Sequence, residues 1–227
     1  MSRLEVTGAG LREGVFLAEH LLPPEEPLLP DVRAAAIDNL LAGCDANVAH
    51  AHHVAALSLQ LHDSLVRAKA IRPLPGERDL LWAAAMAHDV GMAVAYDGHA
   101  AHPHYLVLNA GLPGFTPRET ALIGQMARYH RKGNPTLGQF SSLGEDGDEE
   151  MLTRCSAVLR VAEQLERSRD QAVDRVRVKL DNGRVELTLD THEDVRVARW
   201  AAQNEAEVFK KAFGRDLAIS EGRRAAG

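Results

Sequence analysis

The sequence has 227 residues, of which 45% are hydrophobic, 26% charged and 4% aromatic, and its formal net charge is -6. This composition predicts a helix-rich globular chain with one large domain, or one domain and a small appendage. An acidic chain is a poor general binder of nucleic acid. With two cysteines, a disulfide framework is not expected and Cys-rich metal clusters are excluded, and no apolar run reaches membrane-spanning length.

The N-terminal residues contain no long apolar core, so no secretory signal is expected and a reducing cytoplasm is the predicted location. Histidine is the informative residue type. Nine of the 11 histidines lie between His50 and His130. This density makes a metal or catalytic site the first hypothesis.

Helical spacing of apolar residues dominates the first 172 residues. Asn47 is a predicted N-cap, and Thr116, Pro117 and Glu119 form a predicted helix start. An acidic, solvated and mobile loop is expected at "LGEDGDEE". The predicted helices are 10–22, 31–41, 47–70, 77–90, a short one through Tyr105 and Leu108, 117–131 and 149–171.

The pattern changes after residue 172. Apolar and polar residues alternate in "VDRVRVKL" and "RVELTL", and "DNG" joins the two runs, which predicts a β-hairpin. A helix over 193–213 and an edge strand at "RDLAIS" are expected to follow. The predicted fold is mainly α, with a helical domain over 1–172 and a small α+β subdomain over 173–227.

Each of four predicted helices carries a His, Asp or Glu that could bind a metal, placed in line with the helix's apolar face. His50 lies one turn before Val54, and His88 follows Ala84 by four residues. These positions are far apart in the sequence, so only a helical bundle could bring them together. They are His50, the adjacent His88 and Asp89, His130, and Glu163.

Imidazole and carboxylate groups bind divalent metals such as Mn, Fe, Ni, Co or Zn, which can activate water. Neighbours in a helix point about 100° apart, so His88 and Asp89 can meet one metal only at a helix end, or bridge two metals. A lone histidine on an apolar face is more often a structural or surface residue. We interpret His20, His53, His62 and His192 in that way, and His52 is ambiguous.

The stretches "HAHHV" and "MAHDVG" resemble the HD superfamily of metal-dependent phosphohydrolases. The longer stretch "HDVGMAVAYDGHAAHPHYLVLNAGLPGFTPRETALIGQMARYHRKGNP" resembles the C-terminal HD region of the exopolyphosphatase / guanosine pentaphosphate phosphohydrolase (Ppx/GppA) family. The end, "VELTLDT…FKKAFGRDLAIS", is similar to the terminal subdomain of that family. The resemblance covers about residues 30–222 and implies an HD-type helical bundle with a small C-terminal α+β subdomain.

The resemblance also implies a site that holds one or two divalent ions, with Mn, Fe, Ni, Co, Zn or Mg as candidates. His102 matches a mid-region histidine of the family, and His130 takes the histidine position of "YHRK". Glu163 stands where the family has an Asp, Glu166 replaces a second Asp, and Asp170 is the reserve ligand. The implied metal ligands are His50, His88, Asp89, His102, His130 and Glu163.

The implied activity is metal-dependent hydrolysis of a nucleotide or another phosphoester or phosphoanhydride by metal-activated water. Asp89 takes part in catalysis, and Arg131 and Lys132, with Arg128 as a further candidate, attract phosphate oxygens. The basic "RYHRK" stretch is equally compatible with a solvated helix end. His99 and His104 are interpreted as outer-sphere or exposed residues.

Two alternatives remain open. One is a non-catalytic regulatory module that binds a nucleotide or polyphosphate. Glu163 in place of Asp favours it, as does the lack of a Gly-rich phosphate loop with strand alternation at the start of this sequence. The family's exopolyphosphatase chemistry, which its actin-like ATPase-type domains carry, is therefore not expected here. The other alternative is a structural homodimer that uses the hairpin and terminal helix and holds no metal.

Overall fold

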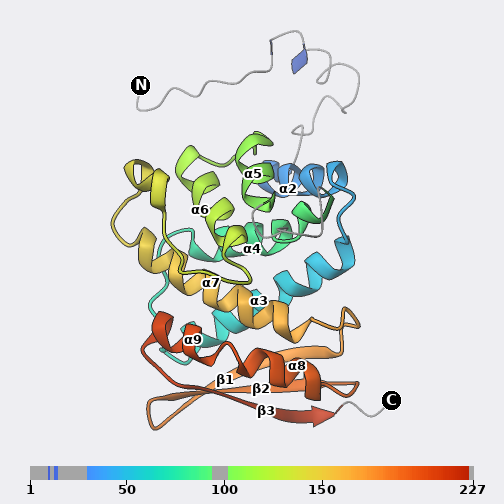
Figure 1. Cartoon of the computed structure of the whole chain (residues 1–227), viewed down its shortest axis with the longest axis vertical. Coiled ribbons are helices and arrows are strands. Elements are labelled where there is room, and N and C mark those ends of the chain that lie inside the picture. Colours follow the sequence, from blue (N-terminus) through green and yellow to red (C-terminus); the bar gives the residue numbers. More distant parts are fainter. Residues whose placement is uncertain (1–9, 11–12, 15–29, 94–101, 225–227) are drawn as a thin grey trace.

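The computed structural model describes residues 10, 13–14, 30–93 and 102–224 (Figure 1). Most of the predicted helix 10–22 lies outside these residues. The other predicted helices of the first 172 residues are present. They are α2 Val32–Gly43, α3 Val48–Arg67, α4 Glu77–Ala87, α5 His102–Asn109, α6 Pro117–Arg128 and α7 Asp148–Leu165, with short 3-10 helices η1 Val90–Ala93 and η2 Gly138–Leu143.

Side-chain caps start the helices that position the site. The Asp31 carboxylate accepts a hydrogen bond from the main chain of α2, and Asn47 Oδ1 accepts one from the N–H of His50 at 3.1 Å. Thr116 and Glu119 form a reciprocal capping box at the start of α6. The predicted helix starts at Asn47 and Thr116 are thus confirmed.

Two predicted helix ends near the site were wrong, and so was part of the loop prediction. α6 ends at Arg128, so His130 lies beyond the helix, and α7 ends at Leu165 rather than at 171. The chain leaves the helical conformation after α7, where Arg169 has a φ of 57°. The acidic loop is not solvated throughout, because Asp148 is only 1% exposed and forms an ion pair with Arg118.

The C-terminal part forms a three-stranded sheet in the order β1-β2-β3. β2 pairs antiparallel with β1 and parallel with the edge strand β3. Asn182 and Gly183 both have positive φ, at 46° and 79°, as a two-residue hairpin turn requires. The predicted helix 193–213 is two helices. The elements are β1 Val173–Asp181, β2 Arg184–Thr191, α8 Arg196–Gln203, α9 Ala206–Phe213 and β3 Leu217–Arg224.

The fold is therefore mainly α with a small C-terminal α+β part, as predicted. The sheet lies below the helical body, with α8 and α9 near α7 (Figure 1). Gln60 of α3 accepts a hydrogen bond from the N–H of Val176 in β1 at 3.0 Å, and one hydrophobic cluster includes both Leu61 and Phe209. The division into domains 1–172 and 173–227 stays a prediction.

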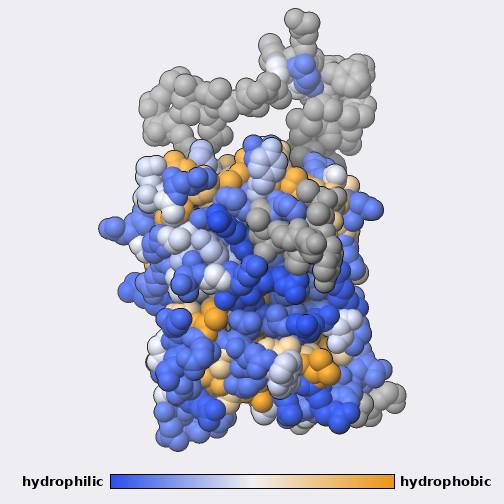
Figure 2. Space-filling model, in the orientation of Figure 1, coloured by the Kyte–Doolittle hydropathy of each residue, from blue (hydrophilic) through white to orange (hydrophobic). Residues whose placement is uncertain are grey.

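The visible surface is mostly hydrophilic, with apolar patches near the top and over the lower part of the molecule (Figure 2). Val197 and Trp200 of α8 are 64% and 67% exposed. The homodimer alternative stays a prediction. No helix of the described part is long and apolar enough to cross a lipid bilayer.

Candidate metal centre

The His88–Asp89 doublet lies where α4 ends. His88 occupies the C-cap position of α4, and η1 begins directly after Asp89. The apolar residues before the doublet are fully buried, whereas Asp89 is 9% exposed. The chain therefore changes conformation at the point where the core meets a polar cluster, which lets both side chains serve one site.

Three further helices or helix ends bring their side chains to this doublet. Glu163 of α7 is central, because its Oε2 lies 3.1 Å from Nε2 of His88 and 3.2 Å from Nε2 of His50 on α3. His130, just past α6, has its Nε2 3.9 Å from Oδ1 of Asp89. The His88 ring lies 5.3 Å, centre to centre, from the rings of both His50 and His130.

Backbone carbonyls fix the ring orientation of two of the histidines. Nδ1 of His88 donates to the carbonyl of Ala85 at 2.6 Å, and Nδ1 of His130 donates to the carbonyl of Ala127 at 2.6 Å. These bonds place the proton of a neutral ring on Nδ1. Nε2 is then the basic atom that faces the cluster, as is usual for a histidine that binds a metal.

The facing atoms come close without aligned hydrogen bonds among the described residues. Nε2 of His50, Nε2 of His88, Oδ1 of Asp89 and Oε2 of Glu163 are all buried without a hydrogen-bond partner. Buried polar atoms are normally satisfied, so a converging set of such atoms needs an explanation. Ligand atoms of His50, His88 and Asp89 lie within 4.8 Å of one another, which suits a shared cation.

The groups of the cluster shift one another's pKa values. Burial alone would lower the pKa of His50, but the carboxylates of Glu163 and Glu166 outweigh it and raise this pKa to about 9. Burial raises the pKa of Glu163, yet the neighbouring His50 and His88 prevail and lower it strongly. Burial and the charge of His88 lower the pKa of His130. The cluster is therefore ionised and polar, unlike an apolar core.

The sequence did not indicate that Arg169 contacts the cluster. Its Nη2 donates to Oδ2 of Asp89 at 2.6 Å, and its side chain is 40% exposed. The turn after α7 holds it there: the N–H of Arg169 donates to the carbonyl of Glu166 at 2.9 Å. The Glu166 carboxylate lies 3.9 Å from Nδ1 of His50 and so behaves as a supporting group of the cluster. No pattern in the sequence indicated this contact.

Other predicted site residues are not brought into the cluster. Nδ1 of His102 is buried without a hydrogen-bond partner among the described residues, but no contact found there joins His102 to the cluster. Arg131 and Lys132 are exposed, and the Asp170 carboxylate accepts a bond from the N–H of Ala172. His99 lies outside the described residues. The exposed or structural interpretation holds for His192, which pairs with Asp174.

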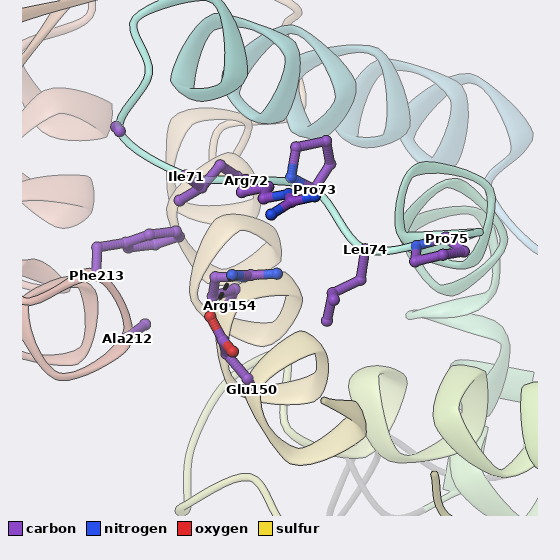
Figure 3. Close-up of a pocket in the computed structure, with 10 residues that line it drawn as sticks. Ile71, Arg72, Pro73, Leu74, Pro75, Glu150, Arg154, Ala212 and Phe213 are labelled. Atoms are coloured by element: carbon purple, nitrogen blue, oxygen red, sulfur yellow. Dashed lines mark hydrogen bonds and ion pairs between the residues drawn. The ribbon is translucent and has the colours of Figure 1, made fainter. Parts of the chain in front are cut away.

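A pocket of about 650 Å³ lies elsewhere, between the α3–α4 connection, α7 and α9 (Figure 3). Arg154 on its wall forms ion pairs with Glu150 and with the buried Glu77. No residue of the histidine cluster lines this pocket. It is therefore separate from the candidate metal centre.

The helical part of the chain thus carries a histidine–carboxylate cluster. A family model described as Ppx/GppA phosphatase, domain III, matches residues 32–206. The chain belongs to this family. Its membership of the HD superfamily stays a prediction.

Two curated relatives are also similar to this chain. The guanosine-5'-triphosphate,3'-diphosphate pyrophosphatase of Pseudoalteromonas translucida (strain TAC 125) is 31% identical over 144 residues, which are 63% of this chain and 28% of that protein. The protein of the same name from Vibrio vulnificus (strain YJ016) is 26% identical over 202 residues, which are 88% of this chain and 37% of that protein. The matched residues thus span little more than a third of the relatives' length at most.

Proposed function

We propose that this chain is a metal-dependent phosphohydrolase that acts on a nucleotide or another phosphoester or phosphoanhydride. One or two divalent ions would be held by His50, His88, Asp89, His130 and Glu163. The main support for a metal site is that buried Nε2 and carboxylate oxygen atoms converge there and lack hydrogen-bond partners among the described residues. The family and the names of the relatives support phosphate chemistry.

The donor set fits the metals. Imidazole nitrogen and carboxylate oxygen suit Mn, Fe, Ni, Co and Zn, with Mg as a further candidate through its carboxylates. Such an ion, when bound, lowers the pKa of water and offsets phosphate charge. The residues of the chain have their own tasks: the Ala85 and Ala127 carbonyls orient two imidazoles, and burial of the cluster limits access of bulk water.

The remaining predicted residues are proposed in weaker roles. Asp89 is the least buried member of the cluster and would be the one nearest to substrate. Arg131 and Lys132 directly follow His130 and would attract the phosphate from the surface by their charge. His102 remains a proposed ligand. The cytoplasmic location stays a prediction.

The test is hydrolysis of a phosphoester panel by metal-loaded protein. The panel should include guanosine 5'-triphosphate 3'-diphosphate, which the relatives' names give. We expect turnover with at least one of Mn, Fe, Co, Ni, Zn or Mg, and its loss in Asp89→Asn. Absence of turnover with every metal, in protein whose unfolding is cooperative, would refute catalysis.

A second candidate is a regulatory module that binds a nucleotide or polyphosphate without cleaving it. Two observations favour it. The Asp89 carboxylate is engaged by Arg169, and the matched residues are a minor part of the relatives. Calorimetry followed by chromatography separates the two functions, because the module returns its ligand unchanged and the hydrolase does not.

A further inference from the structure

We propose that Arg169 is the phosphate-binding residue of the candidate metal centre and contacts the non-bridging oxygens of the ligand's phosphate group. This inference rests on the proposed function, because it assigns a role at the same site. It replaces Arg131 and Lys132 as the direct phosphate contact. The guanidinium of Arg169 is hydrogen-bonded to Asp89, a residue of the cluster.

The position of Arg169 supports its assignment as the phosphate contact. Its guanidinium contacts Asp89, the cluster member with the largest exposed fraction at 9%, and its own side chain is 40% exposed. One end of the guanidinium therefore lies at the cluster and the rest faces solvent. An anion bound at Asp89 from the solvent side would therefore lie within reach of this guanidinium.

The number of N–H donors on Arg169 also supports the assignment. A guanidinium has five N–H donors in a planar fork that matches phosphate oxygens. The Nη2–Asp89 bond is the only side-chain hydrogen bond that Arg169 makes to the described residues, and its side chain is 40% exposed. Donors thus remain available at the mouth of the site for an anion.

The backbone around Arg169 has an unusual conformation. Arg169 has a φ of 57° and Gln171 has the same value, so two non-glycine residues of this turn are left-handed. Such conformations cost stability, and the bond to the nearly buried Asp89 offsets part of that cost. Glu166 fixes the turn from inside, because its carbonyl and its carboxylate accept the N–H groups of Arg169 and Gln171.

The left-handed backbone provides a clean test variant. Arg169→Gly removes the side chain and relieves the unfavourable φ, which offsets part of the cost of leaving Asp89 without its partner, so the protein should remain folded in thermal unfolding. Arg169→Lys keeps the charge but loses the fork. The matched control is Arg167→Ala, since Arg167 is exposed in the same turn and pairs only with Gln164 among the described residues.

The experiment measures binding of inorganic phosphate to the metal-loaded full chain by calorimetry. Arg169→Gly should weaken binding roughly 10- to 100-fold, as loss of a charge-assisted hydrogen bond predicts. Arg169→Lys should fall between Arg169→Gly and wild type, and Arg167→Ala should match wild type. Metal affinity measured without phosphate should be unchanged or higher in Arg169→Gly, because Asp89 is released.

Phosphate binding by Arg169→Gly at wild-type strength would overturn the assignment, as would a parallel loss of metal affinity, which indicates a merely structural role. Failure of the proposed hydrolysis is a different result. If wild type binds phosphate through Arg169 but cleaves no phosphoester, the assignment stands and catalysis falls. If turnover is present and Arg169→Gly keeps the wild-type KM, catalysis stands and the assignment falls.

Discussion

Oε2 of Glu163 lies 3.1 Å from Nε2 of His88, although the two residues come from α7 and α4 and are far apart in the sequence. The same oxygen lies 3.2 Å from Nε2 of His50. A glutamate therefore reaches the centre of the cluster from the position where an aspartate was expected. The side chain of Glu163 is long enough to place its carboxylate between both imidazoles.

The reach of Glu163 can be tested by shortening or neutralising it. Glu163→Gln removes the charge and Glu163→Asp withdraws the carboxylate from both imidazoles, so each should weaken metal binding by about 10-fold or more. Isothermal titration with a divalent metal checks this. Glu207→Gln on the exposed side of α9 is the control. Equal affinity in Glu163→Gln and wild type would remove Glu163 from the ligand set.

The pH dependence of the metal-free protein follows from His50. Its pKa rises from 6.5 to about 9, with burial opposing the shift and Glu163 and Glu166 causing it. A raised pKa in the folded state gives stability that is complete below pH 6.5 and is lost as the pH rises through about 9. Urea unfolding at pH 6.5 and at pH 9 should show a lower free energy of unfolding at the higher value.

Metal binding should have the opposite dependence on pH. A metal needs the unprotonated imidazole of His50, so the apparent affinity should increase between pH 6.5 and about 9. Titration in a chelator-buffered metal solution measures it, together with the protons released. An affinity that stays constant over this range would show that His50 is not a ligand.

A buried ion pair between Glu77 and Arg154 should stabilise the packing of α4 on α7. Their atoms lie 2.7 Å apart. Removing one partner, as in Arg154→Met, should lower the free energy of unfolding by about 3–5 kcal/mol, because Glu77 keeps its charge in the interior. The double variant Glu77→Gln/Arg154→Met should recover much of this loss in chemical denaturation. A double variant as unstable as the single one would contradict the ion-pair explanation.

The same pair predicts an acid limit. Burial raises the pKa of Glu77, but His62, the N–H of Leu74 and Arg154 outweigh it and lower this pKa below its usual value of 4.5. The stability that Glu77 adds is therefore present above pH 4.5 and is lost as the pH falls through the lowered pKa. Wild type should lose stability in that range more steeply than Glu77→Gln.

Arg160 should position His130. It lies one turn before Glu163 on α7, and it donates to the carbonyls of Tyr129 at 2.7 Å and Gly133 at 2.6 Å, on either side of His130. Arg160→Met should cost about 1–3 kcal/mol of stability, because two carbonyls lose their partner. It should also weaken metal binding. Arg78→Ala, which breaks an exposed pair with Asp63, should leave metal binding unchanged.

The helices and several residues of the histidine–carboxylate cluster could be predicted because their signals are local. Asn47 and Thr116 are capping residues in sequence and in structure. The apolar face that contains Val54 predicts the direction of His50, and the hairpin follows from alternation around Asn182 and Gly183. In each case the deciding interaction lies within a turn or two of the chain.

The rest depends on tertiary contacts or on unusual backbone conformations. Arg169 reaches Asp89, 80 residues away, only because the turn after α7 is left-handed, and no periodicity reports that. Asp148 reads as part of a solvated acidic run, but Arg118 of α6 buries it. The end of α6 before His130 likewise depends on Arg160 of another helix.

The central claim is that the histidine–carboxylate cluster binds a divalent metal. Its most direct test is the metal content of the full chain, measured by elemental mass spectrometry after reconstitution and desalting. Wild type and the control His192→Ala, whose ring is at the surface, should retain one or two ions per chain, whereas His88→Ala and Asp89→Asn should retain almost none. Folded wild-type protein without metal, or equal metal content in all four proteins, would contradict the account.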